Sequence, residues 1–171
     1  MSSPTGKQPD VNQSIELSRS AQRVQGALKT HGVDCQVVEL PDTTRTAKEA
    51  AEAIGCSVDQ IVKSLIFRAR QSDRPVLVIA SGSNRVNEKR IGQMLGEKIG
   101  KASADFVREK TGFVIGGVPP LAHETKPETF IDESLLAFDE IWAAAGTPFA
   151  VFRLTPEDLL KITNGQVTSI G

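Results

Sequence analysis

The stretch Ile61–Ala80 reads IVKSLIFRARQSDRPVLVIA and decides the fold of this chain. It contains two apolar runs, Ile61–Ala69 and Pro75–Ala80, separated by the polar link Arg70–Arg74. Runs of this length that are rich in Val, Ile and Leu are typical of strands, and a short polar link between two of them is typical of a hairpin. The stretch therefore predicts two antiparallel strands and argues against a purely parallel sheet.

A lysine interrupts the first apolar run. Alternate side chains share a face in a strand, so Lys63 is expected on the face of its apolar neighbours Ile61, Leu65 and Phe67, and not on that of Ser64. Lysine is rarely buried without a partner. Two outcomes are open: the ammonium reaches water at the end of the strand, or it lines a pocket in which burial lowers its pKa and an anion or carbonyl satisfies it.

A polar run, Ser81–Asn84, follows the second strand. If the hairpin turns near Ser72, Lys63 lies opposite Ser81 to within a residue or two. Lys63 and the polar run are then expected at the same end of the sheet, where they would frame a pocket.

The bulk composition limits the class of protein. The 171 residues are enough for one domain with a hydrophobic core. A hydrophobic content of 39% and a charged content of 24% are ordinary for a soluble protein, and the net charge of −1 gives no overall attraction to nucleic acid or anionic membrane. A basic cluster between Arg85 and Lys101 is the one candidate surface for a polyanion, although such a run taken alone is more often a solvated helix face.

Targeting and metal-binding signals are missing from the sequence. Residues 1–10 are polar, and no apolar stretch approaches the length needed to cross a bilayer. Cys35 and Cys56 form no redox or metal-binding motif. We therefore expect a cytoplasmic protein with free thiols, no membrane contact, no bound metal and no other cofactor.

Helical and strand patterns alternate along the rest of the chain. Residues 1–13 resemble a flexible tail, which leaves one domain over residues 14–171. We expect a single α+β domain with a mixed, mostly antiparallel sheet flanked by helices. The expected helices span about 17–31, 47–54, 88–95, 104–110 and 156–163, and further strands are expected at Cys35–Leu40, Phe113–Ile115, Thr129–Asp132, Glu140–Ala143 and Phe149–Arg153.

The segment Gly116–Pro120, GGVPP, is the second informative feature. Two glycines allow positive φ angles and close backbone approach, and two prolines stiffen the exit from the loop. Unpaired amides on such a loop suit a carbonyl or oxyanion site, although a tight turn without function is the more frequent reason for the pattern. His123 follows closely and is either a surface residue or a group that positions substrate or moves a proton.

Four motifs in one order resemble a known family. They are TAKEAA at 46–51, which begins with a capping box, IVKSLIF at 61–67, SGSNR at 81–85 and GGVPP at 116–120. Their order and spacing are similar to those of the YbaK/prolyl-tRNA-synthetase-associated domain family, and WAAAGTP at 142–148 also fits. The resemblance runs from about Leu17 to Ile162.

This resemblance implies a partly barrel-like mixed sheet and hydrolysis of the ester of mischarged tRNA, often tRNA for proline carrying alanine or cysteine. Lys63 matches the essential lysine of the family, and Gly116–Pro120 matches its GxxxP loop beside the aminoacyl pocket. The implied catalytic groups are Lys63 and the amides of Gly116 and Gly117. The implied substrate contacts are Thr46, Ser81, Gly82, Asn84, Val118, Pro119, Pro120 and His123.

The sequence leaves alternatives open. The same pocket could hold a nucleotide or a tRNA end without cleaving it, alone or as an accessory of a prolyl-tRNA synthetase. A small-molecule esterase is less favoured because no nucleophile–histidine–acid set is present. Lys63 could act as a base, or it could anchor an oxygen of the terminal adenosine, which is the role we favour. The expected partner is the acceptor end of mischarged tRNA.

Overall fold

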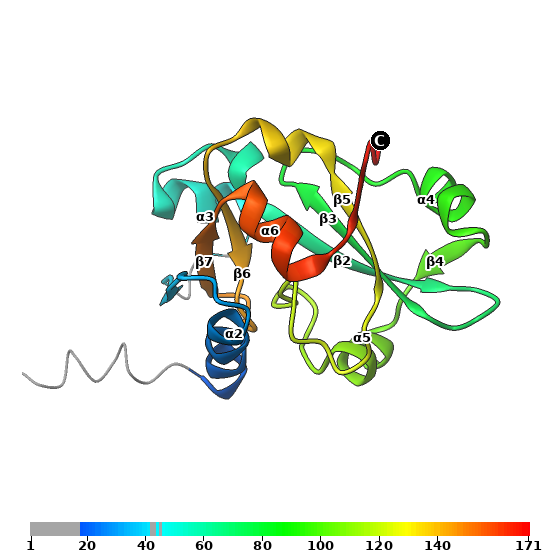
Figure 1. Ribbon diagram of the computed structural model, residues 1–171, viewed down its shortest axis with the longest axis horizontal. Helices are drawn as coiled ribbons and strands as arrows, with labels where there is room; N and C mark the ends of the chain where they lie inside the picture. Colours follow the sequence, from blue (N-terminus) through cyan, green and yellow to red (C-terminus); the bar gives the residue numbers. More distant parts are fainter. Residues whose placement is uncertain (1–17, 42–43, 45) are drawn as a thin grey trace, which may run out of the picture.

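The computed structural model describes residues 18–41, 44 and 46–171, and the expected tail at residues 1–13 lies outside them. Its strands form two sheets (Figure 1). The three-stranded sheet has the order β1 (Val37–Glu39), β7 (Ala150–Leu154), β6 (Ile141–Ala144). The five-stranded sheet has the order β4 (Ile99–Lys101), β2 (Val62–Ala69), β3 (Pro75–Ser81), β5 (Glu128–Asp132), β8 (Gln166–Thr168).

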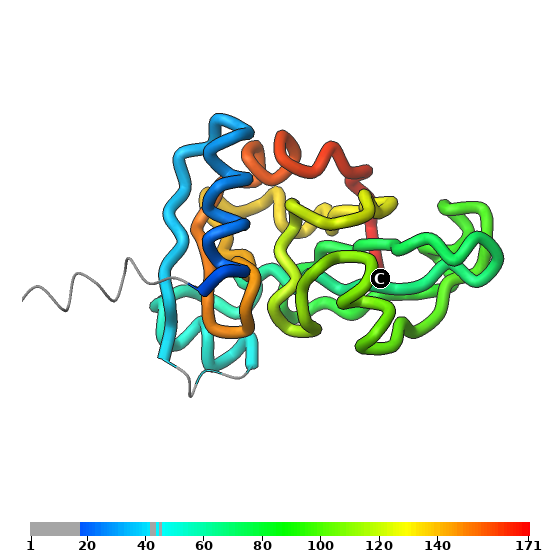
Figure 2. Tube along the Cα trace, turned by 90° about the horizontal axis from the view of Figure 1, so that it is seen from below, coloured from blue at the N-terminus to red at the C-terminus, as the bar shows by residue number. Residues whose placement is uncertain are grey.

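Helices cover the sheets on several sides. The helices are α2 (Arg19–Thr30), α3 (Ala47–Ile54), α4 (Glu88–Leu95), α5 (Ala104–Thr111) and α6 (Pro156–Thr163), with short 3-10 turns η2 (Val58–Gln60) and η3 (Glu133–Ala137). Figure 2 shows α2 and the three-stranded sheet at one end of an elongated molecule and the β2–β3 hairpin at the other.

The expected fold class is confirmed. The β2–β3 hairpin is antiparallel, as are the β2–β4, β1–β7 and β6–β7 ladders. The β3–β5 and β5–β8 ladders are parallel, which makes the larger sheet mixed. Among the described strands neither sheet closes into a barrel. The barrel-like character that the family resemblance implied corresponds to two open sheets packed together.

Strand β3 is the centre of the fold because every residue from Pro75 to Ser81 is buried. Leu77 and Ile79 pack into the main core with α2, α6 and the three-stranded sheet. Val76 and Val78 point to the opposite face, where they pack in a second core beneath α4. The strand is thus covered on both faces, as its unbroken apolar sequence requires.

Helix signals in the sequence act as predicted. Thr46 accepts from the amide of Glu49 (3.1 Å) while Glu49 accepts from the amide of Thr46 (3.0 Å), which completes the capping box of α3. Asn87, Ser103 and Thr155 cap α4, α5 and α6 through their side-chain oxygens. None of the helices described is long and apolar enough to cross a bilayer.

Three local assignments are wrong. Phe113–Ile115 is an irregular turn and not a strand: Phe113 is buried in the main core, whereas Val114 and Ile115 are exposed. This apolar run is not a strand: Phe113 anchors a loop to the core. Strands β4 and β8 were not expected, because three residues carry too little alternation to indicate a strand.

The close backbone packing around Gly82, just after the β2–β3 hairpin, can be tested by substitution. A Cβ at this position would lie 2.3 Å from the carbonyl oxygen of Val58. We expect Gly82→Ala to lower the free energy of unfolding by at least about 2 kcal/mol, because backbone must move. Gly26→Ala in α2 is the control, because a Cβ there meets nothing within 4 Å; it should stabilise by roughly 0.5–1 kcal/mol. Denaturant unfolding measures both, and equal effects would contradict the packing argument.

Candidate functional site

A cleft of about 540 Å³ runs along the outer edge of β2. Strand β4 pairs with β2 only at Phe67–Ala69, and Ile61 bridges to Trp142 at the other end. The edge between these two points is open to the cleft, so its peptide groups are accessible to a ligand. The volume is that of a typical small-molecule site. The far wall is formed by α3, by residues 115–118 and by the segment from Trp142 to Val151.

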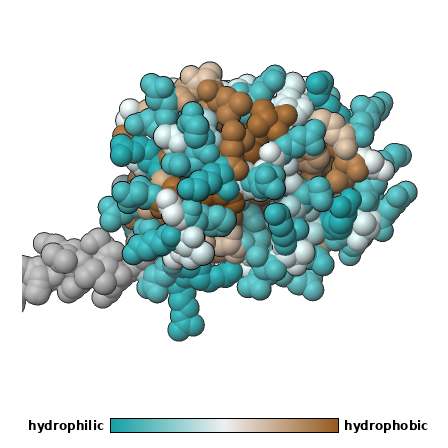
Figure 3. All heavy atoms as spheres, in the orientation of Figure 1, coloured by the Kyte–Doolittle hydropathy of each residue, from teal (hydrophilic) through white to brown (hydrophobic). Residues whose placement is uncertain are grey.

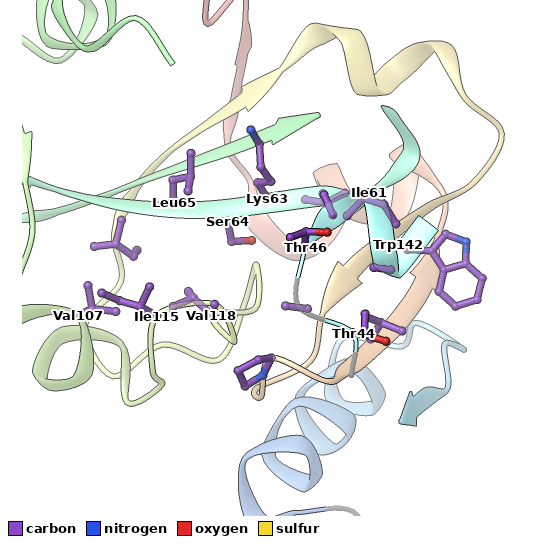
Figure 4. Close-up of a pocket in the computed structure, with 18 of the residues that line it drawn as sticks. Thr44, Thr46, Ile61, Lys63, Ser64, Leu65, Val107, Ile115, Val118 and Trp142 are labelled. Atoms are coloured by element: carbon purple, nitrogen blue, oxygen red, sulfur yellow. The ribbon is translucent and has the colours of Figure 1, made fainter. Parts of the chain in front are cut away.

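The two faces of β2 contribute different chemistry to the cleft. Lys63 pairs with Ala80, whose side chain belongs to the core beneath α4, while Ser64 pairs with Ile79 of the main core. Figure 4 shows Lys63 leaving the strand on the side opposite to Ser64, with Ile115 and Val118 on the side of Ser64. The cleft therefore reaches both faces of the strand around its open edge.

Lys63 meets the polar run after β3, as the hairpin register predicted. Its partner across the hairpin is Ala80, one residue from Ser81. Its Nζ donates to the carbonyl oxygen of Asn84 (2.8 Å). Burial lowers the pKa of Lys63, Arg85 lowers it further, and Asp132 opposes both. A half-buried ammonium with one carbonyl partner keeps donors for a ligand.

Ser64 lines the cleft, and the sequence argument gave it no role in the site. Its hydroxyl is the one buried side-chain polar atom without a hydrogen-bond partner in the part of the chain that is described. Such a group costs free energy unless a ligand satisfies it. Strand alternation had separated Ser64 from Lys63 correctly, but a strand alone does not reveal that the cleft reaches both faces.

The glycine loop contributes fewer bare amides than expected. Gly116 has φ +91°, is exposed and lines the cleft. The amide of Gly117 is used within the loop, because it donates to the carbonyl oxygen of Val114 (2.9 Å). Among the described residues the amides of Gly116 and Val118 have no acceptor. Any oxyanion site on this loop would therefore use those two amides and not that of Gly117.

The rest of the predicted loop set lies behind the cleft wall. Val118 is buried and lines the cleft, but Pro119, Pro120 and His123 do not. His123 Nε2 lies 2.7 Å from the carbonyl oxygen of Pro119, which fixes the loop exit. Burial lowers the pKa of His123, so the ring is mainly neutral at pH 7. The structure gives it a supporting position away from the cleft.

The polar run after β3 is occupied with internal bonds. Ser81 Oγ donates to the carbonyl oxygen of Asp59 (2.7 Å), and Gly82 packs against η2. Asp132, which is 1% exposed, accepts from Asn84 Nδ2 (2.8 Å) and the amide of Ser81 (3.0 Å). These residues shape the carbonyl that holds Lys63 but do not themselves line the cleft. The sequence argument missed Asp132, which reads as the last residue of a strand.

Thr46 lines the cleft, although its hydroxyl oxygen already caps α3. Thr44, which the sequence argument also missed, is buried beside it. Lys63 and Lys101 are the titratable side chains among the described residues that line the cleft. No group of three or more His, Cys, Asp or Glu side chains is placed to hold a metal ion within residues 18–41, 44 and 46–171. The lining therefore offers cations, hydroxyls and amides, and neither thiol nor imidazole.

Comparison with known proteins places this architecture in a family. Residues 41–162 match the model of the aminoacyl-tRNA editing domain. The chain is 35% identical over 131 residues to YwhH of Bacillus subtilis, an uncharacterised protein, covering 77% of this chain and 83% of that protein. It is 25% identical to EbsC of Enterococcus faecalis over 73% of this chain and 76% of that protein. EbsC is named as a candidate Cys-tRNA(Pro)/Cys-tRNA(Cys) deacylase.

A solved structure agrees with these matches. It is 49% identical to this chain, covers 91% of this chain and 98% of its own, and superposes with a TM-score of 0.87. A role as a trans-editing enzyme for prolyl tRNA synthetase has been suggested for that protein. The matched segment contains Lys63, Ser64, the glycine loop and all the cleft residues except Leu40. The chain is a member of the aminoacyl-tRNA editing domain family.

Proposed function

We propose that this chain hydrolyses the ester bond of mischarged aminoacyl-tRNA, of the tRNA-Pro type, as a free-standing editing factor. The observation that carries the proposal is the cleft along β2, which combines the Lys63 ammonium, the unpartnered Ser64 hydroxyl and the Gly116 turn. Family membership and the suggested roles of two relatives support it. A tRNA substrate would place the protein in the cytoplasm.

The lining of the cleft favours attack by water. An aminoacyl ester is activated by the neighbouring ribose hydroxyl, so a side-chain nucleophile is not required. What helps is placement of the carbonyl, donors for the developing oxyanion and a positioned water. The amides of Gly116 and Val118 supply two candidate donors, and the Ser64 hydroxyl supplies a third polar group on the same side of β2.

Lys63 is better placed to anchor substrate than to act as a base. It lies around the strand edge from the glycine loop and close enough to Arg85 for their charges to interact. Two neighbouring cations attract a phosphate of the terminal nucleotide. In this proposal Lys63 binds a phosphate of the terminal nucleotide, and the ester lies on the side of the strand that carries Ser64 and faces Gly116.

The amino-acid end of the cleft is mostly apolar. Ile66, Val107, Ile115 and Val118 line it, with Ser64 among them. Such a lining suits a small side chain of the kind that escapes a synthetase pocket. A synthetase separates amino acids that differ by one methylene by only about 1–3 kcal/mol, so a second hydrolytic site supplies the remaining selectivity. A prolyl-tRNA synthetase is the partner whose errors this site would remove.

A binding module that holds a tRNA end without cleaving it is the second candidate. The described lining residues favour it, because lysine is the one titratable side chain type among them. Turnover separates the two candidates.

The direct test is release of amino acid from tRNA-Pro charged with alanine, cysteine or proline. We expect multiple turnover for at least one mischarged form and none for the proline form. Lys63→Ala should reduce kcat/KM by about 10²–10³-fold, as expected when one charged contact that holds the substrate phosphate is lost. Stoichiometric binding without turnover would support the binding module instead.

Removal of the Ser64 hydroxyl should separate function from stability. Ser64→Ala deletes a buried hydroxyl that has no partner, so the melting temperature should stay the same or rise, while kcat/KM should fall by about tenfold. Ser81→Ala is the matched control, because its hydroxyl is bonded to Asp59; it should lower the melting temperature. A Ser64→Ala enzyme with unchanged kinetics would remove Ser64 from the site.

The pH dependence of deacylation distinguishes an anchoring lysine from a base. Burial lowers the pKa of Lys63 below its usual 10.5. If the ammonium anchors substrate, enzyme-dependent kcat/KM should fall as pH rises through this lowered pKa, because the charge is lost. Lys63→Ala should lack this alkaline fall. A rate that instead rises through the same range would assign Lys63 as the base.

A further inference from the structure

Basic side chains of the described residues differ in whether a carboxylate neutralises them. Those with carboxylate partners within 4.0 Å are Arg23, Arg68, Arg74 and Arg153. Among those that form no ion pair with a described residue, one group gathers around α4, β4 and the loop before α4. We call it the α4–β4 basic surface; its members are Arg70, Arg85, Lys89, Arg90, Lys98 and Lys101.

Strand β4 joins this surface to the cleft. Lys101 at its end lines the cleft, whereas Lys98 just before it lines a second, shallow groove between α4 and β4. Arg70 and Lys89 line the same groove, and the Arg70 guanidinium lies close over the backbone of Gly100. On the other side Arg85 is near enough to affect the charge of Lys63. Cations therefore continue from both cleft lysines onto the outer surface.

Two acids line the groove and leave the surface positive. Glu97 accepts from the amides of Gln71 and Ser72 (both 2.9 Å) and pairs with Arg74. These bonds lower its pKa to about 2, so its charge is fixed on the hairpin turn. Glu88 lies in the first turn of α4, where it interacts with the helix dipole. Neither carboxylate approaches the surface cations within ion-pair distance.

The part of this surface on α4 and β4 has no aromatic side chain. No aromatic ring there offers a base a stacking platform. Its arginines and Gln93 could hydrogen-bond to base edges, but the major groove of an RNA stem is too deep and narrow for side chains to reach them. Hydrophilic side chains fringe this end of the molecule in Figure 3, which has the orientation of Figure 1. Charge without stacking or base-edge contacts gives affinity for phosphates but no sequence discrimination.

We propose that the α4–β4 basic surface binds the sugar–phosphate backbone of the RNA stem whose 3′ end enters the cleft, and that it does so without reading sequence. The proposal deepens the proposed function, on which it rests. It separates two tasks: the surface holds any acceptor stem by charge, and the cleft selects the amino acid. Binding is then weak, salt-sensitive and nearly equal for tRNAs of different identity.

The test measures binding and not cleavage. The probe is an uncharged RNA hairpin with an acceptor stem ending in CCA, titrated with the full chain at several salt concentrations. Lys89→Glu with Arg90→Glu should weaken binding by about tenfold or more at low salt and reduce the slope of log K against log salt by about two. Lys29→Glu with Lys161→Glu, at exposed positions of α2 and α6, changes net charge equally and should leave binding near wild type.

Several outcomes overturn the inference. An equal loss in both double variants would show a net-charge effect without a site. Wild-type affinity in the Lys89/Arg90 variant would remove the surface from RNA binding, and binding of this variant series to anionic vesicles in place of RNA would assign the surface to a membrane. Strong preference for one stem sequence would contradict a surface that reads only charge.

A second readout separates this inference from the proposed function. Deacylation of a short aminoacyl-adenosine ester, which has no stem, should be unchanged in the Lys89/Arg90 variant. If the wild-type chain binds the hairpin but cleaves no ester, the proposed function fails and the surface stands. If the wild-type chain cleaves mischarged tRNA and the Lys89/Arg90 variant binds RNA normally, the proposed function stands and the role of the α4–β4 basic surface is refuted.

Discussion

Strand β2 is paired along its length on one side and only at its end on the other, and the candidate site exists because of this asymmetry. The β3 ladder runs from Val62 to Arg68, whereas β4 covers only Phe67–Ala69. β3 in turn is buried on both faces, so β2 cannot shift without disturbing two cores. An open edge held on so rigid a support gives a ligand fixed peptide groups and two differently equipped faces.

Because β2 presents different side chains on its two faces, the cleft has a cationic part and a separate apolar part. The face beneath α4 carries Lys63 and leads to the basic surface, while the face toward the main core carries Ser64 and the aliphatic lining. A phosphate and an amino-acid side chain need opposite environments, one solvated and cationic, the other dry. A single strand edge supplies both within a few residues because consecutive side chains alternate.

Much of the fold could be predicted from the sequence because local signals agree with one another. The hairpin register was fixed by two apolar runs and a short link, and each predicted cap is present. Phe113–Ile115 failed because one anchored phenylalanine in a loop resembles a strand, and β4 was too short to recognise. Fold prediction therefore succeeded where periodicity extended over several turns or residue pairs.

The site was less predictable for a physical reason. Ser81, Gly82 and Asn84 were expected to contact substrate, yet Ser81 and Asn84 form internal hydrogen bonds and Gly82 packs against η2, and only the Asn84 carbonyl oxygen bonds Lys63. The sequence alone does not distinguish a polar residue that binds the ligand from one that hydrogen-bonds to the protein beside a functional residue. Ser64 was placed on the other face from Lys63 and given no role, because alternation identifies faces but not the open edge around which a cleft can reach both. The edge of β2 is open because β4 is short, and the length of β4 could not be predicted from the sequence.

One part of the cleft wall, the loop at Gly117, packs against its neighbours through backbone. Gly117 lies against the backbone of Thr147, Gly146 donates its amide to Gly117 (3.0 Å), and a Cβ on Gly146 would lie 2.6 Å from the carbonyl oxygen of Ser20. Contacts between main-chain atoms cannot be relieved by rotamer changes, so this wall does not yield to a bulky guest. The backbone of this loop is therefore fixed in position, and the size of substrate that the cleft accepts depends on the side chains that line it.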